Sequence, residues 1–133
     1  MIQQIFVNLP VKDLTRSIAF FGALGFTFNP KFTDEKAACM ILGENMFAML
    51  LVEPFFQGFT KKPVADAAKA TEVIVALSVE SRARVQEFVA KAVAAGAATP
   101  VAAIDHGFMY QHGFEDLDGH QWELFHMDSD AQG

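Results

Sequence analysis

The stretch that decides the fold lies near the C-terminus and reads Glu115-Asp116-Leu117-Asp118-Gly119-His120-Gln121-Trp122-Glu123-Leu124-Phe125. Its Asp-Gly pair predicts a tight hairpin turn, because Gly adopts positive φ readily and Asp can hydrogen-bond its own backbone. The aromatic and aliphatic residues that follow predict a final strand, on which side chains alternate between the two faces.

This alternation makes Glu123 the first candidate site residue. It shares a face with Gln121 and Phe125, while Trp122, Leu124 and His126 take the other face. A carboxylate among apolar neighbours on a central strand is costly to bury, which indicates a functional reason for its presence.

The final strand closes the second of two halves with the same pattern. Each half predicts an apolar strand, a capped amphipathic helix and three further strands. In the first half these lie at residues 2–9, 14–24, 26–32, 36–42 and 46–52, with Pro10 ending the first strand and Asp13 as the N-cap. In the second half they lie at residues 73–79, 82–95, 97–102, 107–114 and 121–126, with Ser81 as the N-cap and Val85, Phe88, Val89, Ala92 and Val93 as the buried stripe. Two β-α-β-β-β units about seventy residues apart predict an α+β fold built on one repeated pattern.

The segment 54–71 interrupts the repeat. It carries Phe55, Phe56 and Phe59, then a polar stretch, and a short helix is predicted at residues 64–69. A loop of this length inside a small domain is usually functional or partly disordered. The three Phe side chains either cap the core of the first unit or form a lid over a pocket.

Composition restricts the class of protein. The chain has 133 residues, 52% of them apolar, which suits one domain with a sizeable core. A net charge of −6 argues against nucleic acid and anionic membranes as partners. Because the start lacks a signal peptide and no apolar run is long enough to span a bilayer, a cytoplasmic location is predicted. The single cysteine, Cys39, is predicted to be an inert core thiol.

The chain resembles the vicinal oxygen chelate superfamily, which includes glyoxalase I, bleomycin-resistance proteins, extradiol dioxygenases and fosfomycin-resistance enzymes. The resemblance is carried by V-K-D-L-T-R-S-I-A-F-F-G-A-L-G-F at 11–26, A-L-S-V-E at 76–80 and D-L-D-G-H-Q-W-E-L-F at 116–125. The small bacterial proteins called predicted lactoylglutathione lyases look most similar. The resemblance implies a single domain over residues 1–133, with modules at about 2–53 and 72–127 joined by a lid-like connection at 54–71. It further implies that the two mixed sheets curl around a cleft, and that the protein is a homodimer.

Active members of this superfamily hold a divalent metal with His and Glu side chains. Carried over to this sequence, the ligand of the last strand is Glu123, whereas the other positions fall on Phe6, on Ile74 and near Met49 or Leu50. These apolar side chains do not ligate a hard cation. Three of the four ligand positions are therefore lost, and no cofactor is predicted, although a divalent metal at Glu123 remains open.

The four histidines all lie in the second half and show no recognised metal-binding spacing. We expect His120 to be exposed at the hairpin turn and His126 to point away from Glu123. His106 and His112 share a strand face with Phe108 and Tyr110, but the sequence does not decide whether that face lines the cleft.

Two function classes are predicted side by side, with a structural role as a third alternative. In the first, the protein binds a small, partly apolar ligand, as the bleomycin-resistance members do. In the second, it is a lyase- or dioxygenase-type enzyme that uses Glu123 as metal ligand or general base on a small carbonyl or oxygenated substrate. Besides Glu123, the candidate ligand contacts are Phe6, Asn8, Phe56, Phe59, Ile74, Tyr110, His112 and Phe125.

Overall fold

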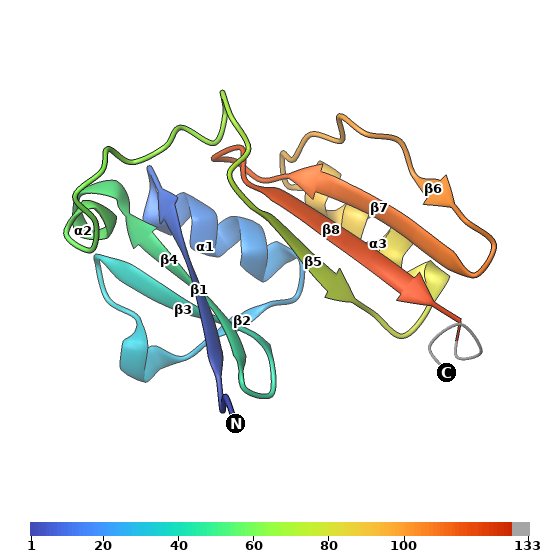
Figure 1. Cartoon of the computed structure of the whole chain (residues 1–133), viewed down its shortest axis with the longest axis horizontal. Coiled ribbons are helices and arrows are strands. Elements are labelled where there is room, and N and C mark those ends of the chain that lie inside the picture. Colours follow the sequence, from blue (N-terminus) through green and yellow to red (C-terminus); the bar gives the residue numbers. More distant parts are fainter. Residues whose placement is uncertain (129–133) are drawn as a thin grey trace. The chain divides into compact units, whose positions relative to one another are not determined.

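Each half of the chain forms its own four-stranded mixed sheet with one long helix (Figure 1). The computed structural model describes residues 1–128. It divides the chain into a first unit, Met1–Ala65, and a second unit that starts at Asp66. This division falls inside the predicted connection, residues 54–71.

The two units have the same order of elements. The first contains β1 (Ile5–Val11), α1 (Leu14–Ala23), β2 (Thr27–Phe28), the 3-10 turn η1 (Pro30–Phe32), β3 (Ala37–Gly43), β4 (Met46–Val52) and α2 (Glu53–Gln57). The second contains β5 (Ile74–Ser78), α3 (Arg82–Ala94), β6 (Ile104–Asp105), β7 (Met109–Glu115) and β8 (Gln121–Met127). The sheet orders are β1-β4-β3-β2 and β5-β8-β7-β6. β1 pairs with β4 in parallel, as β5 does with β8, and all other neighbouring strands are antiparallel. The predicted α+β fold with two β-α-β-β-β units is confirmed.

The helices begin where the sequence predicts. The Asp13 side chain accepts a hydrogen bond from the Arg16 backbone N at 3.1 Å, and the Ser81 hydroxyl accepts one from the Arg84 backbone N at 3.0 Å. Each cap satisfies an N–H group that the first helical turn leaves without an intrahelical acceptor. Within residues 1–128, no helix has the length and apolar composition that crossing a bilayer requires.

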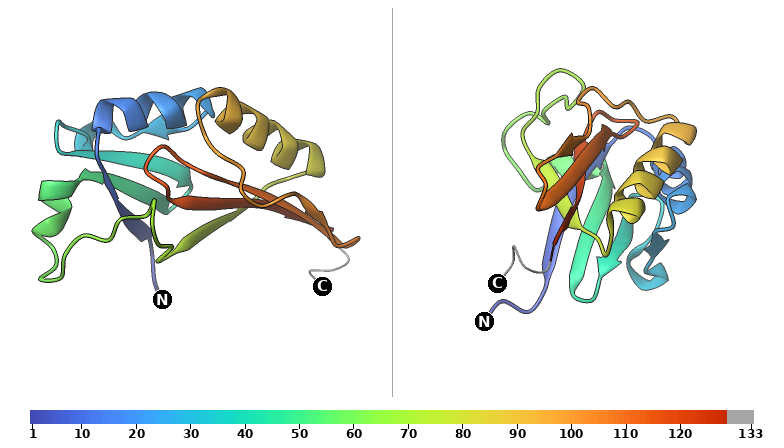
Figure 2. Two further views of the ribbon diagram at one scale, coloured as in Figure 1. Left: turned by 90° about the horizontal axis from the view of Figure 1, so that it is seen from above. Right: turned by 90° about the vertical axis from the view of Figure 1, so that its right-hand side faces the viewer.

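Each long helix covers one face of its own sheet (Figure 2). Under α1 the buried side chains come from alternate positions of the first sheet: Leu9, Val11, Ala38, Met40, Ala48 and Leu50. Under α3 they are Phe114, Trp122 and Leu124, which meet Val85, Phe88, Val89 and Ala92 of the helix. Val93, predicted in the same helical stripe, is exposed. The opposite face of each sheet carries the candidate site residues.

Two predictions in the first unit are wrong in detail. Pro10 lies inside β1 and does not end it. This is tolerated because β1 is an edge strand and needs ladder hydrogen bonds on one side only. The predicted strand at 26–32 is reduced to β2, since the Asn29 side chain accepts a hydrogen bond from the Lys31 backbone N at 3.0 Å and starts the turn η1.

Two further predictions fail between the regular elements. Residues 97–102 form no strand beyond one bridge between Ala98 and Glu115. Residues 64–69 form a turn in which the Asp66 carbonyl accepts from the backbone N of Lys69 and of Ala70. The helix of the connection is α2 instead, and it has Pro54 in its first turn, where a missing N–H costs nothing.

Candidate functional site

Phe6 and Asn8 lie on the face of the first sheet that points away from α1. In the strand register Phe6 pairs with Phe47 and Asn8 pairs with Met49, and paired residues share a face. The rings of Phe6 and Phe47 are stacked, with 4.7 Å between centroids and 13° between planes. Phe6 keeps 46% of its surface exposed, so this face presents a stacked aromatic pair that solvent can reach.

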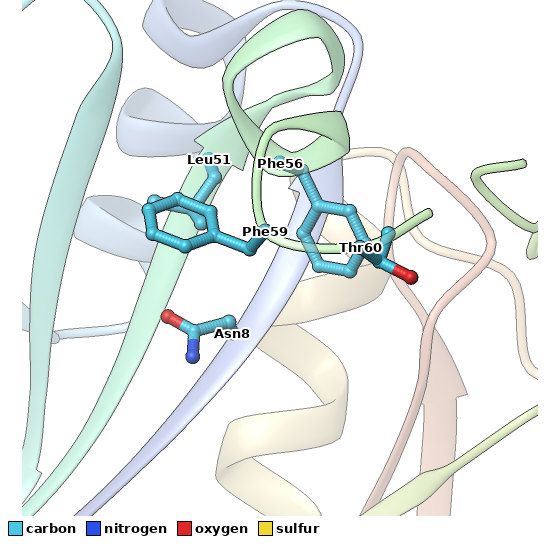
Figure 3. Close-up of a pocket in the computed structure, with 5 residues that line it drawn as sticks. All are labelled: Asn8, Leu51, Phe56, Phe59 and Thr60. Carbon is cyan, nitrogen blue, oxygen red and sulfur yellow. The ribbon is translucent and has the colours of Figure 1, made fainter. Parts of the chain in front are cut away.

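One end of the same face is covered by α2 and the turn after it. Leu51 is only 3% exposed although it points away from α1. Phe56, Phe59 and Thr60 join Leu51 and Asn8 to line a cavity of about 290 Å³ (Figure 3). The connection therefore covers one end of the first sheet and lines a cavity, as the capping alternative predicts, and its role as a lid stays a prediction.

Glu123 lies on the face of the second sheet that points away from α3, together with Gln121 and Phe125, as predicted. It is half-buried, and its partner on β7 is Gly113. A Cβ at position 113 would lie 3.1 Å from Glu123 Oε2 and would collide with the Trp122 carbonyl oxygen. The missing side chain at Gly113 thus gives the carboxylate the space it occupies beside the sheet.

The carboxylate opens onto a hollow of about 320 Å³ on this face of the second unit. The hollow is lined by Ala76, Met109, Gln111, Glu123, Phe125 and Met127. Ile74, which pairs with Gln121, lies on the same face and is 50% exposed. Gln121 Nε2 lies 3.4 Å from Glu123 Oε1, and Gln111 Oε1 lies 3.3 Å from His106 Nε2. The result is a mostly apolar surface with a few polar groups.

Tyr110 and His112 point to the opposite face, beside α3. The register pairs Tyr110 with His126 and His112 with Leu124, which packs under the helix. The Arg82 guanidinium of α3 lies 5.7 Å from the centroid of the Tyr110 ring. The expectation that Tyr110 and His112 line a site with Glu123 is therefore corrected by the register.

Asp116 is a buried carboxylate that the sequence analysis missed. Its Oδ1 accepts hydrogen bonds from the backbone N of Asp118 at 2.9 Å and of His120 at 3.0 Å. Its Oδ2 accepts one from Trp122 Nε1 at 3.0 Å. Burial raises the pKa of the Asp116 carboxyl, while the nearby His120 and these donors act in the opposite direction. The sequence pattern that could have indicated this buried role is an Asp two residues before the Asp-Gly pair and six residues before the only Trp of the chain.

His120 is buried, with 8% of its surface exposed, so the prediction that it is exposed is wrong. The hairpin loop packs against the turn that precedes β5. Gly119 has φ of 91°, and a Cβ there would lie 2.7 Å from the Ala68 backbone N. Only Gly satisfies both the positive φ and this close approach. Cys39 is also buried, as predicted, and burial raises the pKa of its thiol.

Comparison with known proteins identifies the family. The family model described as bleomycin resistance protein-like N-terminal matches residues 3–43. A hypothetical protein from S. aureus is 30% identical over 94% of both chains, with a TM-score of 0.79. A glyoxalase/bleomycin resistance protein/dioxygenase family enzyme from Burkholderia phytofirmans PsJN is 16% identical over 92% of this chain and 96% of its own, with a TM-score of 0.76. A glyoxalase-related enzyme from Fulvimarina pelagi is 20% identical over 94% of this chain and 88% of its own, with a TM-score of 0.77. The chain belongs to the vicinal oxygen chelate superfamily. No curated protein matches it.

The positions where active members of the vicinal oxygen chelate superfamily hold their metal can now be compared with the side chains present. Phe6 and Ile74 lie on the faces away from the helices, and Met49 lies beside Asn8 in the register. Of these four positions, only Glu123 carries a side-chain oxygen. In the part of the chain that the structure describes, His, Cys, Asp and Glu side chains form no group of three suited to a metal ion. The donor set does not fit the divalent metal that the resemblance implies.

Proposed function

We propose that this vicinal oxygen chelate protein binds a small, partly apolar ligand without a bound metal. The observation that carries the proposal is the nature of the two open sheet faces. At the positions implied for metal ligands they present exposed apolar side chains, Phe6 and Ile74. The same faces hold cavities of about 290 Å³ and 320 Å³. Small-molecule sites of about 300 Å³ and upward are typically apolar with a few polar groups that orient the ligand.

The chemistry of both cavities suits recognition of a ligand with an aromatic or aliphatic body. Asn8 and Thr60 are the polar side chains of the first cavity, and Gln111 and Glu123 are those of the second. Burying apolar ligand surface supplies roughly 25 cal/mol per Å², and the polar groups then fix the orientation. We further propose, from the superfamily resemblance, that such a ligand lies in a cleft.

We also propose that the protein is a homodimer. β1 and β5 are edge strands of their sheets, and they carry the exposed residues Ile5 and Ile74. An edge strand with exposed apolar side chains favours association. Light scattering at micromolar concentration is expected to give twice the chain mass, and a monomer mass contradicts this part of the proposal.

The alternative function is a lyase- or dioxygenase-type enzyme that uses Glu123. It is favoured by the position of this half-buried carboxylate, which faces a hollow beside Phe125 and Met109. In that case Glu123 is the group that accepts or donates a proton at the substrate. Turnover of a small carbonyl or oxygenated substrate that is abolished in Glu123→Gln supports this alternative over simple binding.

The proposal is tested by metal analysis of untagged protein purified without chelator, combined with ligand-observed NMR on a set of small aromatic compounds. We expect less than stoichiometric metal, and saturation-transfer signals that persist in EDTA. We also expect no metal-dependent conversion of the methylglyoxal–glutathione adduct. A stoichiometric metal whose removal abolishes ligand binding overturns the proposal, as does glyoxalase turnover at rates typical of enzymes.

A further inference from the structure

We infer that the cavity of the first unit is a subsite for an aromatic ring that carries a neutral carboxamide or lactam group. The inference rests on the proposed function and adds the chemical class of the ligand. It follows from the polar groups of the cavity, from its lack of charge and from the way its rim is held.

The polar groups of the cavity match an amide. The Asn8 side chain offers one acceptor and two donor hydrogens, and no described residue makes a hydrogen bond with it. The Thr60 hydroxyl oxygen accepts from the Lys62 backbone N at 3.2 Å and is turned away from Asn8 (Figure 3), so Asn8 is the residue of the lining that can pair with an amide. A carboxamide or lactam can accept from the Asn8 side-chain N–H while its own N–H donates to the Asn8 side-chain carbonyl oxygen.

The lining selects against a charged ligand. Its five side chains are Asn8, Leu51, Phe56, Phe59 and Thr60, and none is ionisable in the physiological range. Asn8, Phe59 and Thr60 are exposed, so a charged ligand group loses water only where it meets Leu51 and Phe56, and it gains no opposite charge from the lining there. A neutral amide loses less, because the hydrogen bonds that it gives up to water are replaced by those of Asn8.

The rim of the cavity is held in place before any ligand binds. Gln57 Nε2 donates to the backbone carbonyls of Thr60 at 3.2 Å and Lys62 at 2.7 Å, which fixes the turn after α2. The Phe55 and Phe59 rings meet edge to face, at 5.2 Å and 85°. Phe59 is nevertheless 72% exposed, so capping the sheet does not account for its position. A wall fixed in advance lowers the entropy cost of binding an aromatic ring.

The volume of about 290 Å³ suits one substituted ring. The test therefore uses benzamide as the probe, with benzoate as its charged analogue and acetophenone as an analogue that only accepts hydrogen bonds. Each is titrated into the full ¹⁵N-labelled chain in the presence of EDTA. We expect benzamide to shift the backbone signals of Asn8, Phe56, Phe59 and Thr60, and to bind at least about tenfold more tightly than benzoate.

Three variants isolate the contributions. Asn8→Leu keeps the approximate shape and is expected to weaken benzamide about tenfold while changing acetophenone less. Phe59→Ala is expected to weaken both probes. Phe108→Ala removes a comparably exposed Phe of the second unit and is expected to change neither. As a check that does not depend on lost binding, Asn8→Asp is expected to shift the preference from benzamide toward the cation benzamidine.

The outcomes separate the inference from the proposed function. The inference is overturned if benzoate equals benzamide, if Asn8→Leu has no effect, or if no probe shifts any signal in the first unit. If the probes instead shift Ala76, Glu123 and Phe125, the subsite is wrong while metal-free ligand binding stands. If no probe binds in EDTA and every probe binds once EDTA is replaced by an excess of a divalent metal, the proposed function itself fails.

Discussion

Replacing Asp116 with Ala is expected to lower the free energy of unfolding by about 3 kcal/mol. The carboxylate receives hydrogen bonds from the backbone N of Asp118, the backbone N of His120 and Nε1 of Trp122, and all of these residues are buried. Without it, three N–H groups lose their acceptor where water has little access.

The loss of stability expected for Asp116→Ala is the difference between two opposing effects. Three hydrogen bonds to a charged group correspond to roughly 5–9 kcal/mol in total. Burial of the carboxylate opposes this, because it destabilises the ionised form in the folded state and so raises the pKa of Asp116. A net loss of about 3 kcal/mol corresponds to a fall in Tm of about 10 °C for a chain of this size.

The same pKa shift gives the sign of the pH dependence. Because the folded pKa of Asp116 is raised, the folded state holds this proton more tightly than the unfolded chain does. The native protein therefore loses stability as pH rises from about 4 through the folded pKa. The Asp116→Ala variant lacks this titrating group. The difference in free energy of unfolding between the wild-type protein and the variant is therefore expected to narrow as pH rises through that range.

The assay is urea unfolding followed by far-UV circular dichroism at neutral and acid pH. Asp34→Ala is the matched control, since Asp34 Oδ1 also accepts two backbone N–H groups, from Lys36 and Ala37, but is exposed. Water can replace that carboxylate, so a loss below about 1 kcal/mol is expected. A double-mutant cycle of Asp116→Asn and Trp122→Phe is expected to give a coupling energy of about 1 kcal/mol. The reasoning is refuted if Asp116→Ala costs no more than Asp34→Ala.

Three further predictions concern the second unit. Gly113→Ala is expected to cost about 2 kcal/mol and to displace the Glu123 carboxylate, because the new Cβ has no free space; unchanged urea unfolding contradicts this. Glu123→Gln is expected to alter stability by less than about 0.5 kcal/mol, since the side chain is half-buried and its one hydrogen bond is long; a larger loss in the same assay makes Glu123 a structural residue. Arg82→Gln is expected to raise the pKa of Asp105, which the Arg82 hydrogen bond at 2.7 Å holds low, as followed by NMR titration of the carboxyl carbon. The stabilisation from this lowered pKa is present above the pKa of Asp105 in the unfolded chain, and it disappears as pH falls through the pKa in the folded protein. An Asp105 titration that Arg82→Gln leaves unchanged contradicts Arg82 as the cause of the lowered pKa.

The sequence by itself determined the features that depend on short-range geometry. The caps Asp13 and Ser81 could be read because an N-cap bonds within three residues of itself. The alternation of β8 could be read because side chains of a strand repeat every two residues, and this placed Glu123 and Trp122 on opposite faces. The same regularities made the repeated order of elements visible and, with it, the α+β fold.

Tertiary structure decided the features that depend on contacts between distant segments. The alternation of β7 is as regular as that of β8, but only its pairing with β8 shows that Tyr110 and His112 point toward α3. The loop that contains the buried His120 meets the turn at Ala67 and Ala68 through Gly119, a contact across about fifty residues of chain that no local pattern records. The cavity at Asn8 likewise needs α2 to fold back onto β1 and β4. Local propensities fix which face a side chain shares with its neighbours, whereas burial depends on which segment packs against that face.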